Sequence, residues 1–369
     1  MNEPAGIRTS KDHPIPARMK AWVLGGPDEL SLRDKPVPMP GRAEVLVRID
    51  AVAICATDLE IIHCGTPASI QGGLPFNKNF TPGHEYMGTV VALGPDVDEF
   101  EIGERISVEI HAGCGQCKRC RQGMYTSCLN YGKPEKGHRA NGFTTDGGFA
   151  EYAVNHINTL ARVPDTMSDA EATLVVTAGT SMYGLTELGG LVAGESVVVI
   201  GPGPIGLLAV AVAKAIGASP VILTGTRNRR LAIGRELGAD RTINISEEDP
   251  VAVVKELTGG IGADAVLECV GTGQAMSQSL RSARPGGGVG LVGVPHGVSI
   301  DGRELFRSHV RVQGGPAPVR RFLPELIERI LTGAMDPGRV FDLTLPLAQA
   351  ADGYAAMDSR RAIKTLLRP

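Results

Sequence analysis

Residues 197–206 read VVVIGPGPIG, a short β-branched run that enters a glycine turn, and the apolar residues 207–216 (LLAVAVAKAI) predict a helix directly after it. The pattern G-x-G-x-x-G between a strand and a helix is typical of a dinucleotide-binding turn. Gly201 allows the tight turn, Gly203 lets the backbone approach a pyrophosphate, and Gly206 lets the helix pack closely on the strand. Because the chain has 48 glycines, a glycine-rich turn without a ligand is the alternative.

The sequence on both sides of this turn predicts two kinds of structure. Downstream, apolar runs alternate with helical segments; the expected strands are 221–224, 265–269 and 289–292, with helices through 237 and around 274–281. This rhythm indicates a parallel, doubly wound α/β sheet with right-handed crossovers. Upstream of residue 168 we expect mostly strands and long loops, with strands at 19–24, 44–54, 88–93, 105–110 and 148–154.

A helix at 169–188, capped by Ser168 or Asp169, marks the change between the two halves. We therefore predict a first domain over 1–180, with a small lobe at 111–130, and a dinucleotide-binding domain over 181–315. The helix at 319–331 and the strand at 362–367 do not extend the alternation, so we expect residues 316–369 to return to the first domain.

Composition excludes several classes of protein. A chain of 369 residues with a net charge of −3 argues against a nucleic-acid or membrane-surface partner. No apolar run approaches the roughly 20 residues that span a bilayer, and the polar N-terminus lacks the apolar core of a signal peptide, so we expect a cytoplasmic protein. Seven cysteines, four of them crowded together, indicate metal binding rather than disulfides.

The crowded cysteines, Cys114, Cys117, Cys120 and Cys128, have the spacing C-x2-C-x2-C-x7-C. Four thiolates in one loop can close a tetrahedral shell around zinc and leave no position for a substrate, so we predict a structural zinc site. The alternative, disulfides or free thiols, is disfavoured in a reducing compartment.

A second group is spread along the chain: Cys55, with Asp58 beside it, and the pair His84 and Glu85. Sulfur plus imidazole suits zinc, and Asp58 can accept the second ring N–H of His84 and fix its tautomer. Taken singly, a cysteine at a strand end and one histidine are also ordinary core residues.

Together these motifs resemble the zinc-containing medium-chain alcohol and polyol dehydrogenases over nearly the whole chain. The resemblance rests on GHEYMG (83–88), DGGFAEY (146–152), the four-cysteine loop and the glycine turn. The segment CATDLE (55–60) is most similar to sorbitol, glucose and threonine dehydrogenases of this family.

The resemblance implies an α/β protein with a mostly-β GroES-like catalytic domain, which carries the zinc lobe, and a Rossmann cofactor domain. It implies one structural and one catalytic zinc per chain, the latter bound by Cys55 and His84, and by Glu85 directly or through water. Thr57 passes the alcohol proton outward, and either Glu60 or His63 ends the relay. The family's further acidic or cysteine ligand is replaced by Thr177 in this chain.

The implied reaction (EC 1.1.1.-) transfers a hydride between a secondary alcohol, polyol or sugar hydroxyl and NAD(P). We expect NADP over NAD, because Gly225 stands where NAD-binding proteins carry an acidic residue, and Thr226 and Arg227 can bind a 2′-phosphate. The expected cofactor contacts are Gly201, Gly203, Pro204, Ile205, Gly206, Gly225, Thr226, Arg227, Arg230, Val270, Val292, Gly293 and Lys364.

Substrate contacts are expected in loops such as 65–80. The resemblance further implies a homodimer or homotetramer joined through cofactor-domain sheet edges. Two alternatives stay open: a metal-free reductase similar to quinone reductases, which Thr177 would suit, and a dinucleotide-binding protein without enzymatic activity.

Overall fold

In the computed structural model, which describes residues 6–63 and 79–369, the expected break near residue 168 becomes a division into two units. The first contains Met1–Val176 and Phe341–Pro369, and the second contains Thr177–Val340. Each unit has its own sheet and its own buried core.

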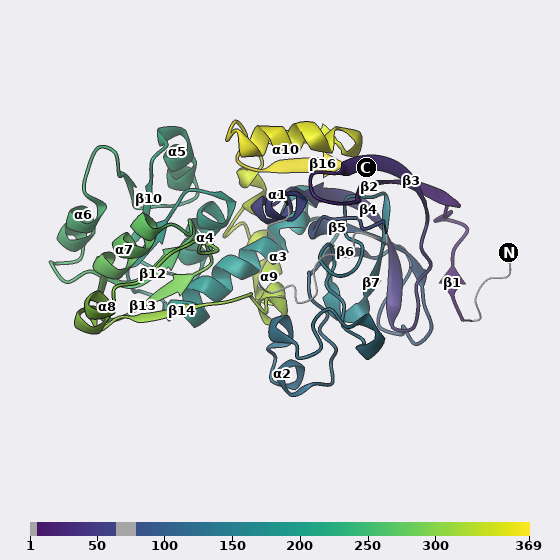
Figure 1. Ribbon diagram of the computed structural model, residues 1–369, viewed down its shortest axis with the longest axis horizontal. Helices are drawn as coiled ribbons and strands as arrows, with labels where there is room; N and C mark the ends of the chain where they lie inside the picture. Colours follow the sequence, from purple (N-terminus) through teal and green to yellow (C-terminus); the bar gives the residue numbers. More distant parts are fainter. Residues whose placement is uncertain (1–5, 64–78) are drawn as a thin grey trace. The chain divides into compact units, whose positions relative to one another are not determined.

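The first unit is built around an antiparallel pair of long strands. Its strands are β1 (Arg8–Thr9), β2 (Arg18–Leu24), β3 (Leu30–Pro36), β4 (Glu44–Ala53), β5 (Glu85–Leu93), β6 (Arg105–Val108), β7 (Tyr152–His156), β8 (Leu160–Arg162), β15 (Leu343–Pro346) and β16 (Thr365–Arg368). Its helices are α1 (Ala56–Ile62), α2 (Lys118–Arg121), α10 (Ala350–Asp358) and the start of α3 (Asp169–Tyr183) (Figure 1).

The main sheet of this unit has the order β15-β16-β4-β5-β6-β8, with β1 on β5 and β7 on β4, while β2 and β3 pair separately. Strand β4 is already buried at residues 45–47, alternates in burial only over residues 47–51, and is wholly buried at residues 51–53, where its sequence predicts a run into the core. The predicted C-terminal strand joins the first unit as β16, which pairs with β4.

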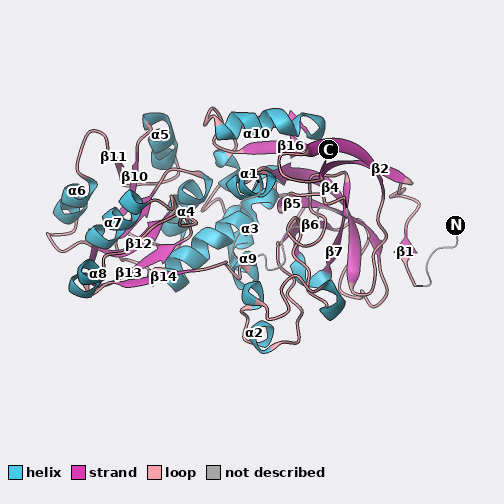
Figure 2. Ribbon diagram, in the orientation of Figure 1, coloured by secondary structure: helices cyan, strands magenta, loops and turns pink. Residues whose placement is uncertain are grey.

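The second unit is a six-stranded parallel sheet of order β11-β10-β9-β12-β13-β14 (Figure 2). Its strands are β9 (Val197–Ile200), β10 (Val221–Gly225), β11 (Arg241–Asn244), β12 (Ala263–Glu268), β13 (Ala283–Leu291) and β14 (Arg311–Gly314). Its helices are α4 (Pro204–Ala215), α5 (Asn228–Glu236), α6 (Pro250–Leu257), α7 (Gly273–Ser282), α8 (Gly302–Ser308) and α9 (Leu323–Leu331). The strand order reverses beside β9, as in a doubly wound dinucleotide-binding sheet, so the predicted fold class is confirmed.

One domain expectation differs from the structure. Helix α9 does not return to the first unit, which resumes only at Phe341. The Arg329 guanidinium donates to the carbonyl of Ala215 at the end of α4, and the short helical turn Pro337–Val340 also contacts α4. These contacts hold α9 and the turn at 337–340 against α4 within the second unit.

Helix α3 begins at a capping box. The Ser168 N–H donates to the Glu171 carboxylate at 2.8 Å, and the Glu171 N–H donates back to Ser168 Oγ at 3.3 Å. Ser168 is therefore the N-cap, one of the two residues that the sequence offered.

Within the described part of the chain, no helix is long and apolar enough to cross a bilayer.

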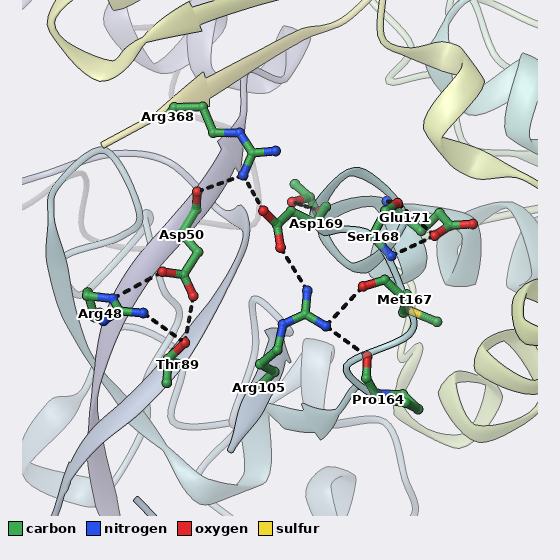
Figure 3. A network of polar contacts seen from close by, with 11 residues as sticks. Arg48, Asp50, Thr89, Arg105, Pro164, Met167, Ser168, Asp169, Glu171 and Arg368 are labelled. Atoms are coloured by element: carbon green, nitrogen blue, oxygen red, sulfur yellow. Dashed lines mark hydrogen bonds and ion pairs between the residues drawn. The ribbon is translucent and has the colours of Figure 1, made fainter. Parts of the chain in front are cut away.

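The first turn of α3 also fastens the C-terminal strand (Figure 3). The Asp169 carboxylate accepts a hydrogen bond from Arg105 of β6 at 2.7 Å and another from Arg368 of β16. Arg105 also donates to the carbonyls of Pro164 and Met167. Burial opposes ionisation of Asp169, but Arg368 and Arg105 outweigh it and lower the pKa of this carboxyl.

We predict that Asp169→Asn lowers the free energy of unfolding by roughly 1–3 kcal/mol at pH 7, because two charge-assisted hydrogen bonds lose their charge. The native pKa of Asp169 is lowered below the unfolded value of about 3.9. Its contribution is therefore complete above that value and is lost as pH falls through the native pKa. Denaturant titrations of both proteins between pH 3 and 8 measure the difference, which should shrink only in acid.

The control is Asp34→Asn, which breaks an exposed ion pair with Lys20 and should cost less than about 1 kcal/mol. An equal loss in both variants, or a loss at Asp169 that does not change in acid, would contradict the role assigned to Asp169.

Candidate active site and cofactor turn

The four cysteines of the predicted lobe converge on one point. Cys114 and Cys120 have their sulfurs 4.0 Å apart, those of Cys117 and Cys128 are 3.9 Å apart, and all four lie within 4.8 Å of one another. A zinc tetrahedron with bonds of about 2.3 Å has edges of about 3.8 Å, whereas a disulfide measures about 2.05 Å. The spacing therefore fits a metal and not a disulfide.

The chemistry of these thiols also fits a cation. Burial opposes ionisation of Cys117, but N–H groups of Cys120 and Leu129 outweigh it and lower its pKa to about 6. Burial beside the other sulfurs raises the pKa of Cys128 to about 12. The first thiolate forms easily and the last with difficulty, so full ionisation of the set requires a compensating cation such as Zn²⁺.

The second group is assembled by strand pairing. Cys55 follows β4 and forms the N-cap of α1, while His84 and Glu85 stand where β5 begins. Because β4 and β5 are antiparallel and pair Ala53 with Glu85, the end of one strand lies beside the start of the next. The ligand atoms of Cys55, His84 and Glu85 consequently lie within 4.8 Å of one another.

Asp58 links two of these residues. Its Oδ2 accepts the N–H of Cys55 at 2.9 Å, and its Oδ1 lies 3.1 Å from His84 Nδ1, although off the direction of an ideal N–H bond. Because Nδ1 of His84 faces Asp58, Nε2 is the ring nitrogen that is available to bind a metal. Burial disfavours the charged imidazole, but Asp58 and Cys55 outweigh it and raise the pKa of His84, so this position favours a cation.

Lys364, which the sequence places among the expected cofactor contacts, lies beside the Cys55, His84 and Glu85 group in the structure. Its side chain is 1% exposed, and its ammonium bonds the Glu85 carboxylate inside the first unit. The Asp342 carboxylate accepts the N–H groups of Ile363 and Lys364 at 2.7 and 3.2 Å and holds this segment just before β16. Burial lowers the pKa of Lys364, but Glu85 and Cys55 outweigh it and raise it, so the lysine is charged.

The relay residues of the sequence prediction lie on α1. Thr57 and Glu60 are both half-buried and one helical turn apart, so they share a face of the helix. His63 is the C-cap, and its Nδ1 lies 2.5 Å from Asp28 Oδ1. This geometry favours Glu60 over His63 as the next group after Thr57. The loop residues 64–78, where substrate contacts were expected, lie outside the described residues.

Close backbone packing places His84. Gly83 has a φ of +94°, and a Cβ at Gly147 would lie 1.9 Å from the Gly83 carbonyl oxygen. The N–H groups of Gly147, Gly148 and Phe149 bond the carbonyls of residues 81, 83 and 82. Residues of the motif DGGFAEY (146–152) thus bond the backbone of residues 81–83 and hold it in place directly before His84.

In the second unit, the glycine turn lies between β9 and α4, as predicted. Gly201 has a φ of +100°, and a Cβ at Gly206 would lie 1.9 Å from the Gly201 carbonyl oxygen. At Gly203, the N-cap of α4, a Cβ would meet no atom of the protein within 4 Å. The protein itself does not require glycine at 203, so its small size fits the approach of a ligand to the helix N-terminus.

The other expected cofactor residues gather along the same edge of the sheet. One row of the register joins Thr224, Ile200, Glu268 and Leu291, and Gly225, Gly201, Val270, Val292 and Gly293 follow these positions. Val270 fills the space beside Gly201, because a Cβ there would lie 2.5 Å from Val270 Cγ2. Thr226 and Arg227 are exposed and Arg230 is half-buried at the start of α5.

Two contributors were missed by the sequence reasoning. Glu268 is buried, and its Oε1 accepts the N–H groups of Val270 and Gly271 at 2.7 and 2.9 Å. Lys35 donates to Thr81 and to Asp146, which tie together the loops around His84. For Glu268, the available signal was a carboxylate at the end of an apolar strand. Lys35 gave none.

A doubly wound sheet with a dinucleotide turn, a Cys-His-Glu group and a four-cysteine lobe define a zinc-dependent, nucleotide-binding oxidoreductase. Family models agree: residues 41–165 match the alcohol dehydrogenase GroES-like domain, and residues 204–331 match the zinc-binding dehydrogenase domain.

Relatives extend this agreement over most of the chain. L-threonine 3-dehydrogenase of Pyrococcus abyssi is 40% identical over 73% of this chain and 74% of its own. Sorbitol dehydrogenase of Bacillus subtilis is 35% identical over 77% of both chains. A structure described as a zinc-binding dehydrogenase of Sinorhizobium meliloti bound to NADP is 30% identical, with a TM-score of 0.84 over 96% of this chain and 100% of that one. The chain belongs to the zinc-containing medium-chain alcohol and polyol dehydrogenase family.

We predict that Cys117→Ser removes one zinc per chain and lowers the melting temperature, since a closed zinc site contributes folding free energy. Metal analysis and thermal unfolding measure the two effects. The control is Cys269→Ser, outside both described cysteine clusters, which should keep its zinc. Unchanged metal content in Cys117→Ser would refute a structural zinc site in the lobe.

We also predict that Thr177→Val keeps both zincs, because a neutral hydroxyl is a poor zinc ligand. Thr177 is buried, and its hydroxyl bonds no described residue. Metal analysis of this variant is compared with His84→Asn, which should lose one zinc. Loss of one zinc on removing the threonine hydroxyl would instead make that oxygen a ligand.

Proposed function

We propose that this chain is a zinc-dependent oxidoreductase that transfers a hydride between a secondary alcohol, polyol or sugar hydroxyl and NADP. The observation that carries the proposal is the buried group of Cys55, His84 and Glu85, whose ligand atoms lie within 4.8 Å of one another. A metal-free reductase would have no use for a thiol, an imidazole and a carboxylate gathered beside a charged lysine.

The proposed site needs two groups that the protein would bind. Zinc would act as a Lewis acid at the substrate hydroxyl, and NADP would accept the hydride. Cys55 and His84 would hold the metal, with Glu85 as a direct or water-mediated third group. Lys364 neutralises one of the anionic charges, so the group together with a divalent cation is close to neutral.

The chain's own residues would then handle the proton. When the substrate C–H electron pair leaves as hydride, the hydroxyl proton has to leave as well. The Thr57 hydroxyl would accept this proton and pass its own to Glu60, one turn further along α1. Asp58 orients His84 through its imidazole Nδ1, so it is a positioning residue.

The substrate class is proposed from the relatives. L-threonine and sorbitol, for which two relatives are named, are both small molecules with a secondary hydroxyl. A panel of hydroxy amino acids, polyols, sugars and secondary alcohols with NADP and with NAD, combined with zinc analysis, tests the function. Turnover of a panel member with two zincs per chain is expected; one zinc and no turnover across the panel would contradict it.

The preference for NADP rests on the end of β10. Gly225 carries no carboxylate that would repel a 2′-phosphate, Thr226 can donate its hydroxyl, and the exposed Arg227 guanidinium has no partner among the described residues. Structures of relatives include one bound to NADP and one described as NAD-dependent, so the proposed preference rests on residues 225–227 of this chain. A homodimer or homotetramer and a cytoplasmic location stay predictions.

We predict that Arg227→Ala lowers NADP affinity roughly 10- to 150-fold, because one hydrogen bond to a charged group is worth about 1.5–3 kcal/mol. NAD affinity should hardly change, since NAD has no phosphate at that position. Fluorescence titration with NADPH and NADH measures both. The control is Arg235→Ala at the far end of α5, which should leave both affinities unchanged; an equal loss for both cofactors at Arg227 would overturn the assignment.

A further inference from the structure

Gly225, the last residue of β10, has a steric environment that its sequence position does not reveal. A Cβ at this position would lie 2.4 Å from Pro202 Cδ and 2.5 Å from Pro202 Cγ. Carbon atoms in favourable contact are about 3.5–4.0 Å apart, so the clash is severe. The φ of Gly225 is not in the left-handed region, so space rather than backbone conformation requires glycine here.

The Pro202 ring cannot move aside as the end of a flexible side chain would. Its Cδ is bonded to the backbone nitrogen, and the ring fixes φ near −65°. The turn around it is held at both ends: the Gly201 N–H donates to the Thr224 carbonyl at 3.0 Å, and the Leu207 N–H donates to the Gly203 carbonyl at 2.9 Å. A displacement of Pro202 therefore displaces the phosphate-binding turn.

We propose that Pro202 is a specificity-determining residue for the cofactor. Its ring occupies the volume in which a side chain at 225 would begin, and so excludes the carboxylate that would bind the ribose hydroxyls of NAD. Arg227, two residues further along the chain, is exposed and therefore accessible to a 2′-phosphate. The inference rests on the proposed NADP function and adds that the preference is set by two residues, 202 and 225, acting as a pair.

The result expected for Gly225→Asp depends on whether residues 202 and 225 act together. If residue 225 acted alone, Gly225→Asp would change the cofactor preference of the protein from NADPH to NADH. With Pro202 in place, the aspartate instead displaces the glycine turn, so the variant binds both cofactors weakly. Alanine at 202 lacks Cγ and Cδ, the two atoms in the clash, and therefore makes room for the carboxylate.

The experiment is a cycle of four zinc-loaded proteins: wild type, Pro202→Ala, Gly225→Asp and the double variant. Titration with NADPH and NADH, followed by fluorescence, gives both dissociation constants without a substrate. We expect Gly225→Asp to lose at least tenfold in NADPH affinity with no gain for NADH. The double variant should bind NADH at least tenfold more tightly than Gly225→Asp and should prefer NADH over NADPH.

Two results would overturn the proposal. One is Gly225→Asp alone binding NADH more tightly than NADPH, with the melting temperature of the wild type. The other is a double variant whose NADH affinity equals that of Gly225→Asp within twofold. In either case, Pro202 does not determine how a side chain at residue 225 affects cofactor binding.

Uncharged variants separate the steric effect from the charge. Gly225→Ala should lower the melting temperature, and adding Pro202→Ala should lower it no further than Pro202→Ala does alone. The matched control is Gly273→Ala at the first residue of α7, where a Cβ meets no atom within 4 Å, and its melting temperature should not fall. A wild-type melting temperature and NADPH affinity in Gly225→Ala would refute the steric exclusion even if the aspartate variant is too unstable to study.

The wild-type protein distinguishes this failure from a failure of the proposed function. If the wild type binds NADH as tightly as NADPH, the proposed cofactor preference is wrong, whereas the dependence of the 225 variants on residue 202 still tests the steric pair. If the wild type prefers NADPH and the effects of the two substitutions on NADH affinity are additive, the proposed cofactor preference stands and the proposed coupling between residues 202 and 225 is wrong.

Discussion

The first unit depends on the balance of charge around Cys55, His84 and Glu85. Asp58 and Glu85 are buried within it, and an unpaired charge in such a place costs several kcal/mol. Lys364 supplies one positive charge by bonding Glu85. In the proposed site, a divalent cation would supply the rest once the Cys55 thiol ionises, so the metal and the lysine would together complete an assembly that neither completes alone.

This charge balance gives a physical role to the C-terminal segment of the chain, which belongs to the first unit. Lys364 stands immediately before β16, and Asp342 and Arg368 hold the two ends of the segment that carries it. The last 29 residues, Phe341–Pro369, belong to the first unit, and they bring the compensating cation as well as a strand. The tie between Arg368 and Asp169 is thus remote in sequence from the site but supports the strand beside it.

How much of this could be predicted depends on whether the information is local in the sequence. The four-cysteine lobe, the glycine turn and the N-cap at Ser168 were predicted because ligand spacing, turn chemistry and capping are written within a few residues. The pairing of Lys364 with Glu85 joins residues 279 positions apart, and no local pattern encodes it. Helix α9 was assigned to the wrong unit because its contacts with α4 are tertiary. The edge strands β11 and β14 were missed because they are short and polar.

The two sites respond to substitution in different ways because different forces build them. At the metal group the requirement is electrostatic, so a replacement is tolerated to the extent that it keeps charge and a donor atom. At the cofactor turn the requirement is steric: Gly225 is fixed by Pro202 atoms about 2.4 Å from its missing Cβ. We therefore expect a carboxylate at residue 225 to bind the ribose hydroxyls of NAD only when the Pro202 ring atoms are removed as well. The metal group can be altered one residue at a time, whereas residues 202 and 225, which would clash with each other, are expected to change cofactor binding only as a pair.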